Sequence, residues 1–249
     1  PGTPILRSAY RPLAYTVDTV DLDFSLDAEA TQVTNRMRCV RNLDAEAGPV
    51  VLFGDGLELV SLTVDGVAPA AGALRQTGTG FELDVDADEL VLEIVTRINP
   101  SANLTLSGLY RSRGGFYTQC EAEGFRRITY FPDRPDVMAR YTVRLEADAA
   151  TCPVLLSNGN LLETGSLPGG RHFARWEDPF PKPSYLFALV AADLKALERR
   201  VETASGREVL LQVWVEARDL DRVGHAMDSL VHSMRWDEDV FGLELDLDR

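Results

Sequence analysis

Apolar and polar side chains alternate along most of the first 193 residues. Residues 20–27 place four large apolar side chains at every second position and three aspartates and a serine between them. Successive side chains of a strand point to opposite faces, so this segment has one apolar and one acidic face. The pattern recurs in short runs at residues 37–39, 60–64, 81–85, 90–94 and 141–145. Short strands of this kind between Gly, Asp, Asn and Pro turns predict a mainly β protein, built as an antiparallel sandwich or barrel.

Turn residues punctuate this region. Asp65-Gly66 follows the run at residues 60–64, and Asn158-Gly159 lies between two apolar runs in VLLSNGNLL. Asn-Gly suits the left-handed backbone of a two-residue hairpin, so we predict a β-hairpin across Asn158-Gly159. DPFPKP, residues 178–183, contains three prolines. Because proline cannot donate to a central strand ladder, this stretch predicts a stiff connector or an edge crossing.

The pattern changes after residue 193. Residues 209–215 alternate as one strand, and apolar side chains then recur at three- and four-residue steps from Leu220 to Met234. That spacing predicts an amphipathic helix, with Asp219 as its N-cap and Gly242 as its stop. LELDL, residues 243–247, returns to strand alternation, and the chain ends inside this pattern. We therefore expect a domain of residues 1–193, and the beginning of a second domain of a longer protein in residues 194–249.

Composition narrows the possible partners. The chain has 45% hydrophobic residues, enough for a core, and a formal net charge of −14. Nucleic acids and anionic membranes attract basic surfaces, so neither is expected as a partner. The three cysteines are widely spaced without a CxxC pair, which argues against a disulfide framework and favours a reducing cytoplasm. The longest apolar run, YLFALVAA, is too short to span a bilayer.

Familiar catalytic motifs are missing from the sequence, which has no GxSxG, no HExxH and no P-loop pattern. His225 and His232 are seven residues apart, so on a helix they would lie about 10 Å apart along the axis. Zinc ligands bind at about 2 Å, so this pair cannot share one ion. The sequence itself therefore offers no catalytic or metal-binding set.

One stretch, QCEAEGFRRITYF at residues 119–131, crowds acids, bases and aromatics together. If the segment is extended, Gln119, Glu121 and Glu123 face the same side and offer three acceptors to a donor-rich ligand such as an ammonium group. Alternatively, the two glutamates pair with Arg126 and Arg127 as part of the scaffold. Taken alone, the local pattern favours these ion pairs.

Longer stretches add a resemblance to a known family. TQCEAEGFRRITYFPDRPDVMARYTVRLEAD, DPFPKPSYLFALVA and SMRWDEDVFGLELDLD closely resemble the N-terminal portion of the bacterial aminopeptidase N family. The resemblance implies a saddle-shaped β-sandwich domain, followed by the first strand and helix of a thermolysin-like α/β catalytic domain. Members are zinc metallopeptidases that remove single residues from peptide N-termini. Their GAMEN and HExxH motifs do not occur here, so the zinc ligands would lie outside this chain, which alone would be inactive.

The resemblance also implies a role for two residues. The Gln-x-Glu of the family signature binds the α-amine of the substrate and matches Gln119 and Glu121, whereas Glu123 carries no such role. It further implies a cis peptide bond between Glu121 and Ala122. A peptide α-amine titrates near pH 8 and is largely cationic at neutral pH, which suits an acceptor pair. The expected partners are peptides with a free N-terminus and the remainder of the same polypeptide.

Two other functions compete with this hypothesis. A stand-alone β-sandwich binding module could use its acidic face for protein or sugar contacts, without zinc. Glycoside hydrolysis by Glu121 and Glu123 is a weaker alternative. Residues two apart on one strand lie about 7 Å apart at their Cα atoms, but the sequence indicates no arrangement on opposite faces of a sugar.

Overall fold

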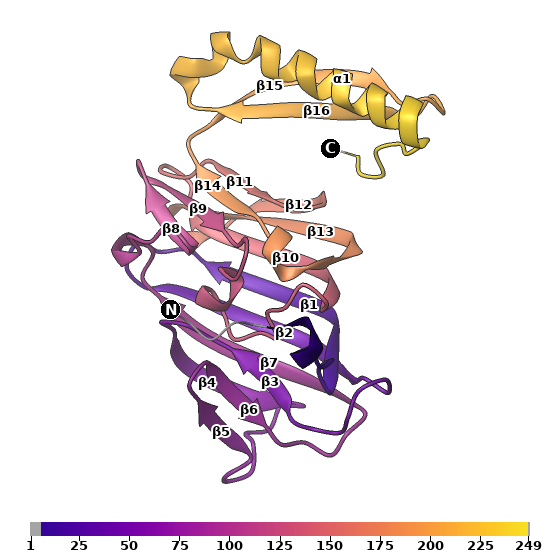
Figure 1. Ribbon diagram of the computed structural model, residues 1–249. Helices are drawn as coiled ribbons and strands as arrows, with labels where there is room; N and C mark the ends of the chain where they lie inside the picture. Colours follow the sequence, from indigo (N-terminus) through magenta and orange to yellow (C-terminus); the bar gives the residue numbers. More distant parts are fainter. Residues whose placement is uncertain (1–5, 249) are drawn as a thin grey trace.

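Strands dominate the computed structural model, which describes residues 6–248 (Figure 1). The alternation of apolar and polar residues therefore predicts the mainly β class correctly. Short 3-10 turns join several strands, and they are η1 (Arg7–Ala9), η2 (Pro100–Ala102), η3 (Phe125–Arg127), η4 (Pro168–Gly170), η5 (Ser184–Leu186) and η6 (Ala217–Arg222). No helix in the described range is both long and apolar enough to cross a membrane.

The largest sheet has seven strands in the order β12-β13-β10-β1-β2-β7-β4. Their bounds are β1 (Tyr15–Ser25), β2 (Thr31–Arg41), β4 (Glu58–Val64), β7 (Glu89–Ile98), β10 (Met138–Asp148), β12 (Asn160–Ser166) and β13 (Arg171–Pro183). Neighbouring strands are antiparallel except β1 and β10, which run parallel with Val20 opposite Tyr141. The sheet is therefore antiparallel as predicted, with one parallel pair that the sequence did not indicate. Parallel neighbours need a long crossover, which residues 26–137 supply.

Two smaller sheets share the core of the large one. One has the order β11-β14-β9-β8, and the other β3-β6-β5. A single buried cluster contains side chains from all three sheets, including Phe24, Leu52 and Leu189. The strands of the two smaller sheets are β3 (Val50–Phe53), β5 (Leu74–Thr77), β6 (Gly80–Leu83), β8 (Gly108–Ser112), β9 (Gly115–Gln119), β11 (Val154–Ser157) and β14 (Leu189–Ala192).

A register shift in β4 overturns one expected core position. The pairing of β4 with β7 shifts between Leu59 and Ser61, so that Val60 points outward and is exposed. An extra residue in one strand of an antiparallel pair reverses the alternation locally, and sequence periodicity does not reveal it.

The turn at Asn158-Gly159 is sharp, as predicted, but it does not close a hairpin. Gly159 has φ of +87°, while β11 pairs with β14 and β12 pairs with β13. The turn therefore passes the chain from the four-stranded sheet to the seven-stranded sheet. Gly159 therefore has the expected left-handed backbone, whereas Asn158 does not, and the partner of each strand depends on residues far away in the sequence.

We expect Gly159→Ala to destabilise the protein more than Gly66→Ala. Both glycines have positive φ, so each substitution costs about 1 kcal/mol in backbone conformation. A β-carbon at Gly159 would also clash with the backbone of Glu177, whereas nothing lies within 4 Å of one at Gly66. The clash adds about 1–3 kcal/mol, measurable by urea unfolding. Equal unfolding free energies for the two variants would refute this account.

A separate small unit follows the large sheets (Figure 1). It contains β15 (Lys195–Glu202), β16 (Glu208–Val215) and α1 (Gly224–Phe241). The buried side chains of Val209, Leu211, Met227 and Met234 form its own core. The two methionines come from α1, so the helix has a buried apolar face as its spacing predicts.

Three expectations for this unit need correction. β15 forms a hairpin with β16, where one strand was predicted, and its sequence KALERRVE hides this because only Leu197 and Val201 contact the core. The helix begins at Gly224 rather than after Asp219, because residues 217–222 form a 3-10 turn, and it ends at Phe241, directly before the predicted stop at Gly242. Residues 243–247 are not a strand. They lie beside β16, with the Leu210 amide donating to the carbonyl of Asp248.

Candidate functional site

The candidate residues lie where β9 ends. Gln119 is the last residue of this strand and pairs with Gly108 of β8. The chain then turns, and both Glu121 and Glu123 are exposed in the turn. The expectation of an extended segment that aligns all three acceptors on one face is therefore wrong. The turn brings Glu121 back toward Gln119. The Gln119 side-chain Nε2 donates a hydrogen bond to the Glu121 carbonyl oxygen at 3.2 Å.

Glycine closes this turn. The Gly124 amide donates to the Cys120 carbonyl at 2.7 Å, and a β-carbon at Gly124 would clash with the Gln119 carbonyl oxygen. Only a residue without a side chain therefore fits between the strand end and β8. The Glu121–Ala122 peptide bond is cis, which confirms the expectation from the family resemblance.

Beneath the turn the chain enters the core. Phe125 is fully buried, and its ring packs edge-on against Phe131, Tyr141 and Phe187 at centroid distances of 5.1–6.2 Å. Cys120 is also buried, and burial raises the pKa of its thiol. A buried thiol with a raised pKa has little thiolate and is poorly reactive.

Glu121 and Glu123 differ in their ion pairs. Glu123 lies 3.4 Å from the Arg126 guanidinium, which also pairs with Asp133 at 2.9 Å. Arg127 instead pairs with Asp55 at 3.1 Å, far from it in sequence. Within residues 6–248 the Glu121 carboxylate has no hydrogen bond and no ion pair. The scaffold interpretation therefore holds for Glu123 and fails for Glu121.

This arrangement offers acceptors to a cation. The Gln119 Nε2 group donates a hydrogen bond to the Glu121 carbonyl oxygen. The Gln119 Oε1 atom and the Glu121 carboxylate remain as free acceptors. An ammonium group has three donors and no acceptor, so it complements this pair. The Gln119 Oε1 atom and the Glu121 carboxylate are therefore available as acceptors for such a group.

Metal binding does not fit the described part of the chain. No three His, Cys, Asp or Glu side chains come together there in an arrangement that could hold an ion. His172 lies 2.7 Å from the carbonyl of Cys152, and His225 and His232 are exposed on α1. Residues 6–248 by themselves therefore do not form a zinc site.

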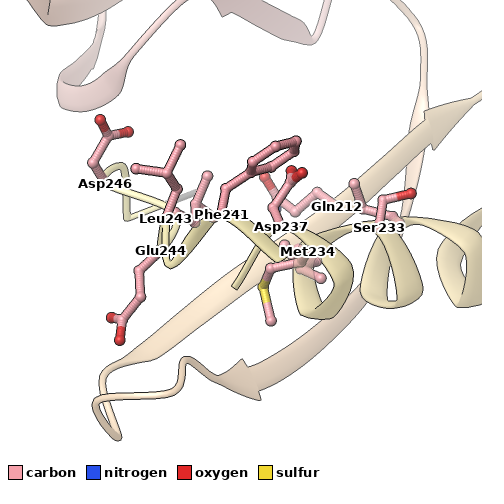
Figure 2. A pocket seen from close by; sticks show the side chains of 11 residues that line it. Gln212, Ser233, Met234, Asp237, Phe241, Leu243, Glu244 and Asp246 are labelled. Atoms are coloured by element: carbon pink, nitrogen blue, oxygen red, sulfur yellow. The ribbon is translucent and has the colours of Figure 1, made fainter. Parts of the chain in front are cut away.

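Several hollows lie on the surface of the described chain. One, of about 660 Å³, is formed by α1, β16 and residues 243–246, and Figure 2 shows Met234, Phe241 and Leu243 around it. A second hollow of about 370 Å³ lies against the turn, where Glu123 and Arg126 line it together with Asp55. Neither is lined by Gln119 or Glu121.

Sequence reasoning missed the distant partners of this turn. Asp55 follows β3, and Ser184 opens η5, yet both contact the network of Arg126, Arg127 and Asp133. No local pattern identifies them, because tertiary structure alone brings those segments together.

Comparison with known proteins shows what this chain is similar to. Residues 75–186 match the peptidase M1 N-terminal domain. The chain is 51% identical to aminopeptidase N of Caulobacter vibrioides over 239 residues, and 47% identical to aminopeptidase N of Escherichia coli over 242 residues. These matches cover 96% and 97% of the chain.

Solved structures show the same fold. A crystal structure of Legionella pneumophila aminopeptidase A in complex with aspartic acid is 34% identical, with a TM-score of 0.91 over 97% of this chain and 29% of that one. An M1 zinc metallopeptidase from Deinococcus radiodurans, 17% identical with a TM-score of 0.67 over 82% of this chain and 48% of its own, shares the fold. The chain spans only 28% of the length of the two bacterial aminopeptidases N. Residues 75–186 therefore belong to the peptidase M1 N-terminal domain, and the chain as a whole is similar to part of bacterial aminopeptidase N.

Proposed function

We propose that this chain is the N-terminal portion of a zinc aminopeptidase, and that it holds the α-amine of peptide substrates. One observation carries the proposal. Glu121 presents an exposed carboxylate without a partner in the described chain, while Glu123, two residues away, is paired with Arg126. An anchor of this kind selects substrates by their N-terminus, because an internal peptide segment offers no ammonium group to the carboxylate.

The catalytic apparatus belongs, on this proposal, to residues outside the chain. Zinc would be one ion of the longer enzyme, held by ligands that residues 6–248 do not supply. We propose a domain boundary at residues 193–194, and the separate cores of the two units support it. The partners would be peptides with a free N-terminus and the remainder of the same polypeptide, without nucleic acid or membrane. Three unpaired, buried cysteines support a cytoplasmic location.

Comparing the chain with the longer polypeptide tests the proposal. We expect the purified 249-residue chain to hold no zinc by elemental analysis and to leave an aminoacyl chromogenic substrate intact. The longer polypeptide should contain about one zinc per chain and cleave the substrate. Turnover by the 249-residue chain, or a longer polypeptide without zinc and activity, would contradict the proposal and favour a binding module.

A further inference from the structure

Asp133 is a buried carboxylate with an unusual set of partners. It is only 3% exposed, and one of its oxygens, Oδ2, accepts from both the backbone amide of Arg126 at 3.1 Å and the Arg126 Nε at 2.9 Å. The hydroxyl of Ser184 donates to its other oxygen. A buried charge is costly unless it is paired and hydrogen-bonded, and here every near partner is a donor. Asp133 thus joins three chain segments at one point.

Arg126 connects Asp133 to the turn at residues 120–124. Its guanidinium also donates to the Asp133 carbonyl at 2.7 Å and lies 4.6 Å from the centre of the Phe53 ring. Its own carbonyl accepts from the Asp55 amide at 2.9 Å. Arg126 follows Glu121 by five residues, and the chain between them is the closed turn at Gly124. The C-terminal end of that turn is therefore fixed.

Ser184 connects Asp133 to β9, the strand from which the turn begins. From Ser184 the chain continues through η5 into β14, whose Val190 pairs with Tyr117 of β9. Beside this pair, the Thr118 hydroxyl accepts from the Leu189 amide at 2.8 Å. Thr118 immediately precedes Gln119. Asp133 is therefore tied to the strand that carries Gln119 and to the turn that carries Glu121.

We propose that Asp133 is a positioning residue for the α-amine anchor. Two connections lead from Asp133 to the anchor. One runs through Arg126 to the turn that carries Glu121, and the other runs through Ser184 and β14 to β9, which carries Gln119. These connections fix the spacing of the two acceptors, although both are exposed side chains. The inference rests on the proposed function of Gln119 and Glu121.

Hydrogen exchange in the 249-residue chain gives the first test. In Asp133→Asn, the amides of Gly124, Arg127 and Ile128 should exchange at least about tenfold faster than in the wild type, because weaker contacts permit more local opening. Asp136→Asn is the matched control. Asp136 pairs with Arg134 at 2.7 Å in the same segment, but no contact joins its side chain to residues 119–127 in the described structure. Equal exchange of these amides in Asp133→Asn and the wild type would overturn the proposal.

Kinetics of the longer polypeptide separate positioning from general damage. The measured quantity is the ratio of kcat/KM for a peptide with a free α-amine to kcat/KM for the same peptide lacking that amine. Asp133→Asn should lower this ratio about tenfold, while Asp136→Asn leaves it unchanged. A purely structural role would lower both rates together and preserve the ratio, which would overturn the proposal.

The Glu121→Gln variant shows whether a negative result refutes the amine anchor or only the positioning role of Asp133. If its ratio equals that of the wild type, the proposed amine anchor itself is wrong. If Glu121→Gln lowers the ratio and a folded Asp133→Asn does not, only the positioning role is wrong. If Asp133→Asn fails to fold, Ser184→Ala replaces it, since it removes one donor and keeps the carboxylate. Faster exchange and a lower ratio in Ser184→Ala would support the proposal, and wild-type values of both would overturn it.

Discussion

Glu121→Gln is expected to lower kcat/KM of the longer enzyme about 10- to 150-fold for peptides with a free N-terminus. Glutamine preserves the shape of the side chain and its acceptor oxygen, but removes the negative charge that the ammonium group would meet. A hydrogen bond to a charged group contributes about 1.5–3 kcal/mol. Each 1.4 kcal/mol of lost transition-state binding corresponds to a factor of about ten in rate.

Glu123→Gln is the matched control for this prediction. Glu123 lies two residues away in the same turn and is exposed, but its carboxylate contacts Arg126. Exposed ion pairs contribute little, about 1 kcal/mol or less, so its kcat/KM should stay within severalfold of the wild type. Equal losses in the two variants would show that the turn tolerates no change of charge, and would remove the case for a specific role of Glu121.

Phe125→Ala is expected to reduce the free energy of unfolding by about 3–5 kcal/mol. Phe125 is fully buried, and three aromatic rings surround it. Truncation removes the transfer free energy of the ring and leaves a cavity that those rings cannot close without leaving their own contacts. Urea unfolding monitored by circular dichroism measures the loss, provided that the m-value is unchanged.

Phe180→Ala provides the comparison. Phe180 lies in the proline-rich half of β13 and is 43% exposed. Its truncation should cost less than about 1 kcal/mol, because solvent already reaches much of the ring. A smaller loss for Phe125→Ala than for Phe180→Ala would mean that the turn at residues 120–127 does not rest on the core as described.

Side-chain alternation predicted the central strands well because one face of each is buried. In β1, Val20, Leu22 and Phe24 are buried as the pattern indicates. β15 escaped notice because its sheet has only two strands, and its charged residues face solvent. The sequence pattern also did not predict which strands pair with each other. The turn at Gly159 has the predicted backbone, yet the strands on either side of it join different sheets.

The candidate site was predictable in part. QCEAEGF marked the position of Gln119 and Glu121, and the resemblance to a family, rather than the local pattern, distinguished Glu121 from Glu123. The sequence did not predict the turn after Gln119, because period-2 reasoning assumes an extended backbone. It also gave no indication that Asp133 would connect to Ser184, since tertiary packing brings these residues together over 51 positions.

A structure of the longer polypeptide with a bound peptide-like inhibitor that has a free α-amine tests the central claim most directly. We predict that the inhibitor's ammonium nitrogen lies about 2.7–3.2 Å from the Glu121 carboxylate and from the Gln119 Oε1 atom, as charge-assisted hydrogen bonds require. An ammonium group bound elsewhere, with Glu121 facing solvent as it does in the 249-residue chain, would contradict the account.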